Sequence, residues 1–186
     1  MELMQAIVSR RATREYKDTA TEEARIEQLI NAAILAPSAM NRQPWAYAVL
    51  RDRDRIEDHA QRAKLWLLAN VAQYSQEPSI RRMLENPEYS LFHHAPALAL
   101  ILATSSDTQA AEDCCLAAEN FMLAARDEEL GTCWVGLARP WLNLSPIKVE
   151  LELPERYHVV APIVLGYPKA WPEAHERNPA QIHWLG

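Results

Sequence analysis

The feature that most constrains the fold is an uninterrupted apolar run at residues 96–103, bounded on both sides by turn-forming residues. A short run of this kind is typical of a strand that is buried on both faces. The next segment has apolar residues at helical spacing from Asp107 or Thr108 to Leu130, and it predicts a long helix with Gly131 as its C-terminal cap. Small residues along this helix indicate close packing, either inside the chain or across a dimer.

The remaining patterns predict strands at residues 45–50, 132–136 and 157–165, and helices at residues 2–9, 21–36, 55–73 and 145–151. Strands separated by helices indicate a mixed sheet with helices on its faces. Thr21 and Ser145 are expected to cap two of the helices, because a hydroxyl can accept a hydrogen bond from a free N–H of the first turn. Pro162 has no N–H, so the last strand is expected at a sheet edge or with a bulge.

Residues 74–89 contain two prolines and many charged side chains, and they predict a mobile or variable excursion rather than a regular element. The length of 186 residues suits a single domain over residues 1–186, and 49% apolar residues are enough for a core. The formal charge of −6 gives no general attraction for nucleic acid or for an anionic membrane. Any site for an anion must therefore be built locally, from a few basic residues.

The first residues carry no basic segment followed by an apolar one, so no secretory signal is expected. The longest apolar run, at residues 95–103, is too short to cross a bilayer. Cys114, Cys115 and Cys133 fit no metal or disulfide spacing. These features predict a cytoplasmic protein with reduced thiols.

The loop at residues 36–45 combines stiffness with polar side chains. Pro37 and Pro44 fix the backbone near its two ends, and Ser38, Asn41 and Gln43 supply a hydroxyl and two amides between them. Short polar groups on a stiff loop suit the recognition of a flat polar heterocycle. An ordinary helix end followed by a turn explains the same residues.

Arg10, Arg11 and Arg14 fall within five residues directly after the first predicted helix. Such a cluster can be a solvated surface run. It can also bind a phosphate, because the planar guanidinium group matches phosphate oxygens with paired, charge-assisted hydrogen bonds. In an acidic chain a compact basic cluster makes the second interpretation worth testing.

Four segments, in this order, resemble the FMN-dependent nitroreductase family: IVSRRATR at residues 7–14, APSAMNRQPW at residues 36–45, LGTCWVG at residues 130–136 and VLGYP at residues 164–168. Arg177 and His183-Trp184 follow them. The resemblance implies an α+β fold with a mixed, mainly antiparallel sheet flanked by helices, and an intertwined homodimer with FMN at the subunit interface.

When the family's FMN-binding residues are matched to this sequence one by one, the resemblance implies contacts to both parts of the FMN. Arg10, Arg11, Arg14 and Arg177 would hold the phosphate and ribitol. The residues Pro37, Ser38, Asn41 and Gln43 would reach the isoalloxazine of the partner subunit's flavin, while Val135 and Gly136 would lie near the flavin N5 with a backbone N–H as donor. Ala12 stands where the family most often has serine, so one hydroxyl toward the phosphate or ribityl chain is missing.

The resemblance implies hydride transfer from NADH or NADPH through FMN to a small electron-poor acceptor, such as a nitro compound or a quinone. Two alternatives stay open. One is different flavin chemistry on the same scaffold, such as dehalogenation, dehydrogenation or flavin breakdown, and the other is a flavin-binding dimer without activity. No metal site is expected at His93-His94, because adjacent residues of a strand point to opposite faces.

Overall fold

The computed structural model describes residues 1–74 and 77–186, which form an α+β fold around one sheet. The sheet has four strands in the order β1-β2-β4-β3, with every neighbouring pair antiparallel. Their bounds are β1 Trp45–Leu50, β2 Ala97–Ala103, β3 Gly131–Trp134 and β4 His158–Gly166. The expectation of a mixed sheet is therefore wrong for these strands. Among the described residues, parallel pairing is limited to an isolated bridge between Ala12 and Thr132.

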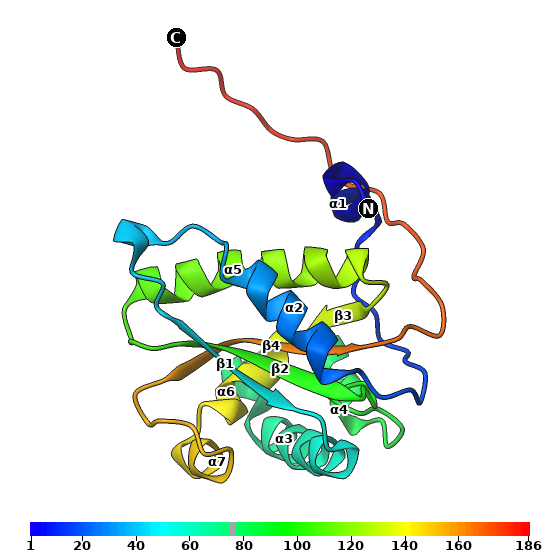
Figure 1. The fold of residues 1–186 in the computed structure, drawn as a ribbon. Coiled ribbons are helices and arrows are strands. Elements are labelled where there is room, and N and C mark those ends of the chain that lie inside the picture. Colours follow the sequence, from blue (N-terminus) through cyan, green and yellow to red (C-terminus); the bar gives the residue numbers. More distant parts are fainter. Residues whose placement is uncertain (75–76) are drawn as a thin grey trace.

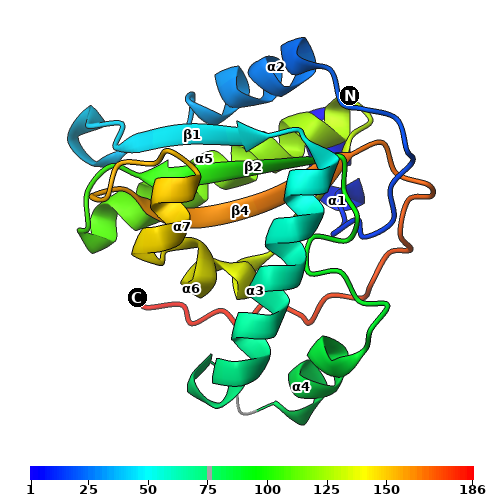
Figure 2. The ribbon, with the colours of Figure 1, turned by 90° about the horizontal axis from the view of Figure 1, so that it is seen from below.

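Helices cover both faces of this sheet (Figure 1). On one face lie α2 (Glu23–Ala33) and α5 (Thr108–Asp127); α3 (Arg53–Tyr74), α6 (Arg139–Leu142) and α7 (Ser145–Glu150) lie on the other, as the view from below shows (Figure 2). The remaining elements are α1 (Leu3–Ser9), α4 (Pro78–Glu85) and the short 3₁₀ turns η1 (Ala39–Asn41) and η2 (Gly136–Ala138).

The central strand β2 is buried along its whole length, as its sequence predicts. Its side chains alternate between two cores because successive residues of a strand point to opposite faces. Leu98, Leu100 and Leu102 pack on the side of α3, whereas Ile101 packs on the side of α2 and α5 together with small alanines. The small residues of α5 that were expected to give close packing do so inside the chain, against α2 and the sheet: Ala110, Cys114, Ala117, Ala118 and Ala125.

The last strand, β4, lies inside the sheet, so an edge position for Pro162 is wrong. The bulge is real but lies at Val160, which has no partner between the pairs Ile101–Ala161 and Leu102–Val159. The carbonyl of Pro162 accepts a hydrogen bond from the N–H of Val135. In an antiparallel strand the N and O of one residue face the same side, so the missing N–H of Pro162 faces the point where β3 has ended.

Helix α5 begins as predicted but ends early. Asp107 accepts a hydrogen bond from the N–H of Ala110 at 2.8 Å and caps the first turn. The last helical residue is Asp127, and the left-handed residue after it is Glu129, with φ of 59°. Gly131 is thus the first residue of β3 and not the cap of the helix. It is tightly packed, because a Cβ there would lie 2.6 Å from the Oγ1 of Thr13.

Two other predicted caps are wrong. Helix α2 starts at Glu23, and the hydroxyl of Thr21 is buried without a hydrogen-bond partner among the described residues. Helix α7 starts at Ser145 itself, whose hydroxyl donates to Glu155 at 3.1 Å. Thr21 is buried by the surrounding structure, and Ser145 is engaged by Glu155, so neither hydroxyl caps its helix.

The predicted excursion at residues 74–89 contains the helix α4, and its residues 75 and 76 lie outside the described residues. Leu84 of α4 is fully buried against the core. The ammonium group of Lys64 on α3 donates to the carbonyl oxygens of Asn86 and Tyr89 at 2.6 and 2.8 Å. These contacts come from residues distant in the sequence, which is why the local pattern did not reveal the helix.

Two segments expose apolar side chains. Helix α1 shows Leu3, Met4 and Val8 to solvent, each about two-thirds exposed, and the extended tail ends with Trp184 and Leu185 almost fully exposed. The tail leaves the rest of the molecule and points away from it (Figure 1). Within the described part of the chain, no helix has both the length and the apolar character needed to cross a membrane.

Candidate functional site

The arginine segment, residues 10–14, follows α1 and contains arginines with unsatisfied nitrogens. The Nε atoms of Arg10 and Arg11 are both buried without a hydrogen-bond partner among the described residues. Arg10 Nε lies 3.5 Å from a carboxylate oxygen of Glu119 on α5, as an ion pair. One terminal nitrogen of Arg11 donates to the carbonyls of Val8 and Arg10 at 2.7 Å, so this side chain folds back over the end of α1.

The arginine segment runs beside β3. The N–H of Thr13 donates to the carbonyl of Thr132 at 2.9 Å, and Ala12 bridges to the same residue. Arg14 is exposed and makes no hydrogen bond or ion pair within the described residues. It borders a depression of about 260 Å³, whose lining residues are Ala12, Arg14, Glu15, Ala170, Trp171 and Pro172.

The charge of Arg14 also reaches the turn before β2. Burial lowers the pKa of His93 to about 4, and the Arg14 guanidinium acts in the same direction. Both His93 and His94 have left-handed backbones, with φ of 55° and 51°. They therefore lie in a turn. The expectation that these two residues belong to a strand, with side chains on opposite faces, is wrong. The imidazole of His94 is within 3.0 Å of the Glu57 carboxylate.

Val135 and Gly136 lie just beyond the other end of β3. The N–H of Val135 is already bonded to Pro162, so it is not free to donate to a ligand. Gly136 is exposed at the start of η2, and the described residues offer its N–H no acceptor. Of the two predicted residues, Gly136 is thus the one with a donor to spare.

The amide loop, residues 36–45, is held in a strained conformation. Met40, Asn41 and Gln43 have left-handed backbones, with φ of 53°, 53° and 50°. The hydroxyl of Ser38 accepts a hydrogen bond from the N–H of Gln43 at 2.9 Å, and the Gln43 amide donates to the Asn41 side-chain oxygen at 3.0 Å. The three predicted polar residues therefore form one network at the tip of the loop.

One buried residue of α5 holds this loop and was missed at the sequence level. The carboxylate of Asp113 accepts a hydrogen bond from the N–H of Ala39, with its two oxygens at 3.2 and 3.3 Å. The signal that could have revealed it is its position among small apolar residues, three after Ala110 and four before Ala117, on the buried face of a predicted helix.

The structure separates the predicted residues into two groups within one chain. The arginine segment and α1 lie near the C-terminal end of α5, whereas the amide loop lies near its N-terminal end (Figure 1). Arg10 reaches α5 at Glu119 and the amide loop reaches it at Asp113, six residues earlier, or about 9 Å along the helix axis. Six residues turn the helix by about 600°, so the two contacts lie on different sides of α5, and no described contact joins the two groups within one chain. The start of the tail, at Ala170, Trp171 and Pro172, borders the same depression as Arg14. Arg177 lies further along this exposed tail, and no described contact joins Arg177 itself to the arginine segment.

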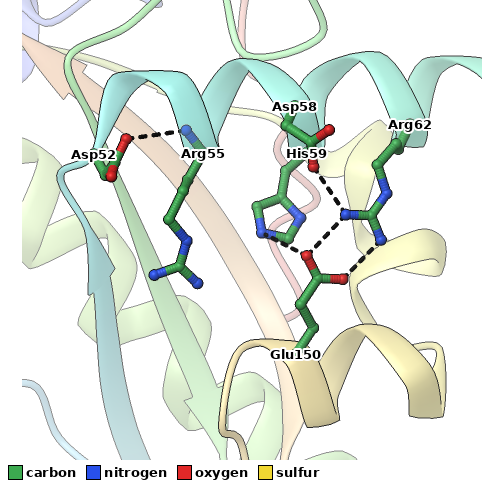
Figure 3. Close-up of polar contacts among 6 residues, drawn as sticks. All are labelled: Asp52, Arg55, Asp58, His59, Arg62 and Glu150. Atoms are coloured by element: carbon green, nitrogen blue, oxygen red, sulfur yellow. Dashed lines mark hydrogen bonds and ion pairs between the residues drawn. The ribbon is translucent and has the colours of Figure 1, made fainter.

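A second polar cluster joins α3 to α7 (Figure 3). Arg62 donates to Asp58 at 2.9 Å and to both carboxylate oxygens of Glu150 at 2.8 and 2.7 Å, while the Nε2 of buried His59 lies 3.7 Å from Glu150. Asp58, His59 and Glu150 are close enough to bind a metal ion together. The guanidinium of Arg62 occupies the space between the carboxylates, so a cation would have to displace it. The geometry fits an ionic contact between two helices.

Comparison with known proteins gives a consistent result over the whole chain. Residues 7–167 match the nitroreductase family. An Archaeoglobus fulgidus protein, provisionally named NADH dehydrogenase/NAD(P)H nitroreductase, is 31% identical over 186 residues, which cover 98% of this chain and 97% of that protein. A Methanothermobacter thermautotrophicus protein with the same provisional name is 27% identical over 188 residues, which cover 98% of this chain and 86% of that protein.

Solved structures agree with this similarity. The crystal structure of a Bacteroides fragilis nitroreductase with bound FMN superposes with a TM-score of 0.84, at 23% identity and with complete coverage of both chains. At this level of identity the superposition establishes the fold. It agrees with the antiparallel α+β architecture described above.

Proposed function

The chain belongs to the nitroreductase family, and we propose that it is an FMN-dependent oxidoreductase that transfers hydride from NADH or NADPH to a small electron-poor acceptor such as a quinone or a nitro compound. Family membership confirms the resemblance seen in the four sequence segments. The observation that carries the proposal is that the buried Nε atoms of Arg10 and Arg11 make no hydrogen bond within the described residues, although Arg10 Nε is ion-paired with Glu119.

The arginine segment fits the phosphate end of FMN. A buried N–H without a hydrogen-bond acceptor is costly, so an anion bound against this segment would stabilise it. Of the three arginines, Arg14 is the one that lines the neighbouring depression. Arg14 adds a third positive charge, and it makes no hydrogen bond or ion pair within the described residues. In a protein with a formal charge of −6, this local excess of positive charge is what an anionic ligand requires.

The amide loop fits the polar edge of the flavin ring. After its internal hydrogen bonds are made, Ser38 keeps a hydroxyl hydrogen, Asn41 keeps its side-chain NH₂ and Gln43 keeps its side-chain oxygen. These groups are two kinds of donor and one acceptor. The pyrimidine part of a flavin offers carbonyl oxygens and one N–H, so the two sets are complementary.

A homodimer would bring the two groups together. If two copies pack with their α5 helices antiparallel, the C-terminal end of one helix lies beside the N-terminal end of the other. The arginine segment of one copy then faces the amide loop of its partner. The uncovered apolar side chains of α1 and of the tail support this arrangement, because an exposed apolar surface of this kind is typical of an interface.

The bound FMN would supply the hydride chemistry. The residues of the chain bind and orient it: the arginine segment holds the phosphate, the amide loop fixes the ring, and the N–H of Gly136 donates to the ring edge. Gly136 also has no side chain, which permits close approach of the backbone to a flat ligand. No acid–base pair from the protein is required for this role.

Two measurements test the cofactor and the reaction. The purified protein is expected to show the visible absorbance of a bound flavin and to bleach under anaerobic conditions when NADH or NADPH is added. Reoxidation by a quinone or a nitro compound would identify the acceptor class. A flavin that bleaches but is not reoxidised by either acceptor would favour different flavin chemistry, and a flavin that does not bleach would favour a binding protein.

A complementation experiment tests whether the site is shared between subunits. Arg10→Ala and Asn41→Ala would each damage both sites of a homodimer. In a mixed dimer of the two variants, one of the two sites combines the unchanged Arg10 with the unchanged Asn41 and is intact. Random reassortment of the two variants should therefore restore about one site in four. No restoration would show that the two residues do not serve one site across the interface.

A further inference from the structure

The residue of interest is Asp113, a carboxylate on α5 that is only 1% exposed. Its hydrogen bonds are to the N–H of Ala39 and to the side-chain amide of Gln109 at 3.4 Å. Within the described residues no lysine, arginine or histidine forms an ion pair with it. Burial of a carboxylate without a counter-ion is expensive. Its hydrogen bond to the loop therefore calls for an explanation beyond packing.

The loop it holds is under strain. A non-glycine residue is disfavoured in the left-handed region because its Cβ is crowded by the backbone there, and this loop has three such residues within four positions: Met40, Asn41 and Gln43. Packing does not compensate, because all three are exposed and Met40 is 92% exposed. Hydrogen bonds must hold the conformation instead.

Among the described residues, hydrogen bonds attach the strained tip to the rest of the fold at its two ends. At one end the N–H of Ala39 donates to Asp113 on α5. At the other end the carbonyl of Pro44 accepts from the N–H of Thr104 after β2, at 2.9 Å, and from the thiol of Cys114 on α5, at 3.9 Å. The Ser38–Gln43 bond is internal to the loop and cannot fix its place in the molecule. Asp113 is thus the side chain that sets where the tip begins.

We propose that Asp113 is a positioning residue for flavin binding, which acts through the amide loop and does not contact the flavin itself. By fixing Ala39, its carboxylate holds Asn41 and Gln43 in the strained conformation that presents their amides to the ring. This inference rests on the proposed function. The strained conformation of the loop is then already present in the free protein, so the binding surface is formed before the cofactor binds.

The first test compares Asp113→Ala with Glu112→Ala, a matched control at the adjacent, exposed position of the same helix. Loss of a charge-assisted hydrogen bond should weaken FMN binding by about tenfold or more and alter the visible circular dichroism of the bound flavin. Glu112→Ala should change neither. Asp113→Asn keeps one acceptor oxygen for the Ala39 N–H, so it should recover part of the affinity.

The second test separates positioning from a general loss of stability. If Asp113 acts through Asn41, the loss of affinity caused by Asp113→Ala should largely disappear in an Asn41→Ala background. Additive effects would overturn the proposal. So would a variant with a lower melting temperature but wild-type affinity and flavin spectrum. If Asp113→Ala fails to fold, the same double-mutant cycle with Asn41→Ala can be measured with Asp113→Asn.

The two proposals fail in different ways. A wild-type protein that binds no FMN refutes the proposed function, and this inference with it. A wild-type protein that binds FMN, alongside an Asp113→Ala protein that binds it equally well, refutes only the role of Asp113.

Discussion

Two arginine-containing clusters of this protein differ in how their guanidinium groups are hydrogen-bonded. Arg62, between α3 and α7, is 40% exposed at its side chain, yet it forms hydrogen bonds to two carboxylates of its own chain. Arg10, in the arginine segment, is less exposed at 24%, yet its buried Nε has no hydrogen-bond partner among the described residues. The arginine that water can reach less easily is thus the one whose buried Nε has an ion pair, with Glu119, but no hydrogen bond.

The difference teaches how to tell a structural arginine from one that binds a ligand. A structural guanidinium finds its acceptors within the chain, so its fixed geometry is complete in the free protein. A binding guanidinium keeps donors unpaired until an anion arrives. On this criterion Arg62 in Figure 3 has a structural role, because its acceptors lie within the chain. The arginine segment, with two Nε atoms that make no hydrogen bond within the described residues, fits the binding role proposed for it.

The largest effect is expected from breaking the binding cluster. Arg10→Ala combined with Arg177→Ala removes two proposed contacts to the FMN phosphate, each worth about 1.5–3 kcal/mol. Binding should weaken by at least roughly 100-fold, and the protein should purify without colour. The ratio of flavin to protein absorbance measures this, with Arg62→Ala as the control that keeps its flavin. Full flavin occupancy in the double variant would contradict the assignment of both arginines.

An intermediate effect is expected from breaking the structural cluster. Arg62→Ala removes a partly exposed network of ion pairs and a contact with the face of Trp141, so stability should fall by about 1 kcal/mol. For a chain of this size the melting temperature should drop by roughly 2–4 °C. Calorimetry at low and high salt checks the prediction, because the loss should shrink as salt screens the pairs.

The same cluster can be tested with zinc. Zinc should not raise the melting temperature of the wild-type protein, because Arg62 lies between the carboxylates. In Arg62→Ala the side chains of Asp58, His59 and Glu150 are free to bind zinc, so zinc should raise the melting temperature of this variant. A lower melting temperature of the wild-type protein after chelation would show that the cluster holds a metal after all.

The smallest effect concerns pH. Burial lowers the pKa of His59 below its usual 6.5, and the hydrogen bonds from Arg62 lower the pKa of Glu150 below 4.5. For both groups the unfolded chain binds protons more readily, so stability falls as pH falls. The loss due to His59 begins near pH 6.5 and that due to Glu150 near pH 4.5.

Melting temperatures between pH 5 and pH 8 check this. His59→Gln should reduce the decline below pH 6.5 without abolishing it, because partly buried His93, whose pKa is lowered to about 4, contributes a loss of the same sign. A change at exposed His94 should leave the decline intact. The slope is compared rather than the absolute stability, because His59 also packs edge-on against Trp141 and its loss costs packing. An unchanged slope in His59→Gln would show that another group is responsible.

Several elements could be predicted because their signal is local. The apolar run became β2, and the long periodic segment became α5, since burial of a whole strand or a helix face leaves its mark on consecutive residues. Helix α4 and the true ends of α2 and α5 could not be predicted in this way. They depend on contacts such as that of Lys64 with the carbonyls after α4, between residues far apart in the chain.

For the candidate site, the sequence by itself determined the chemistry: guanidinium groups in one segment and amides on a stiff loop in another. Residue type decides which hydrogen bonds a side chain can make, and this is readable without a structure. Only the tertiary structure decided where these groups lie. It placed them at different points along α5, left two arginine Nε atoms without a hydrogen bond among the described residues and set Asp113 against the loop. Distance and burial depend on how the whole chain packs, and no local pattern contains them.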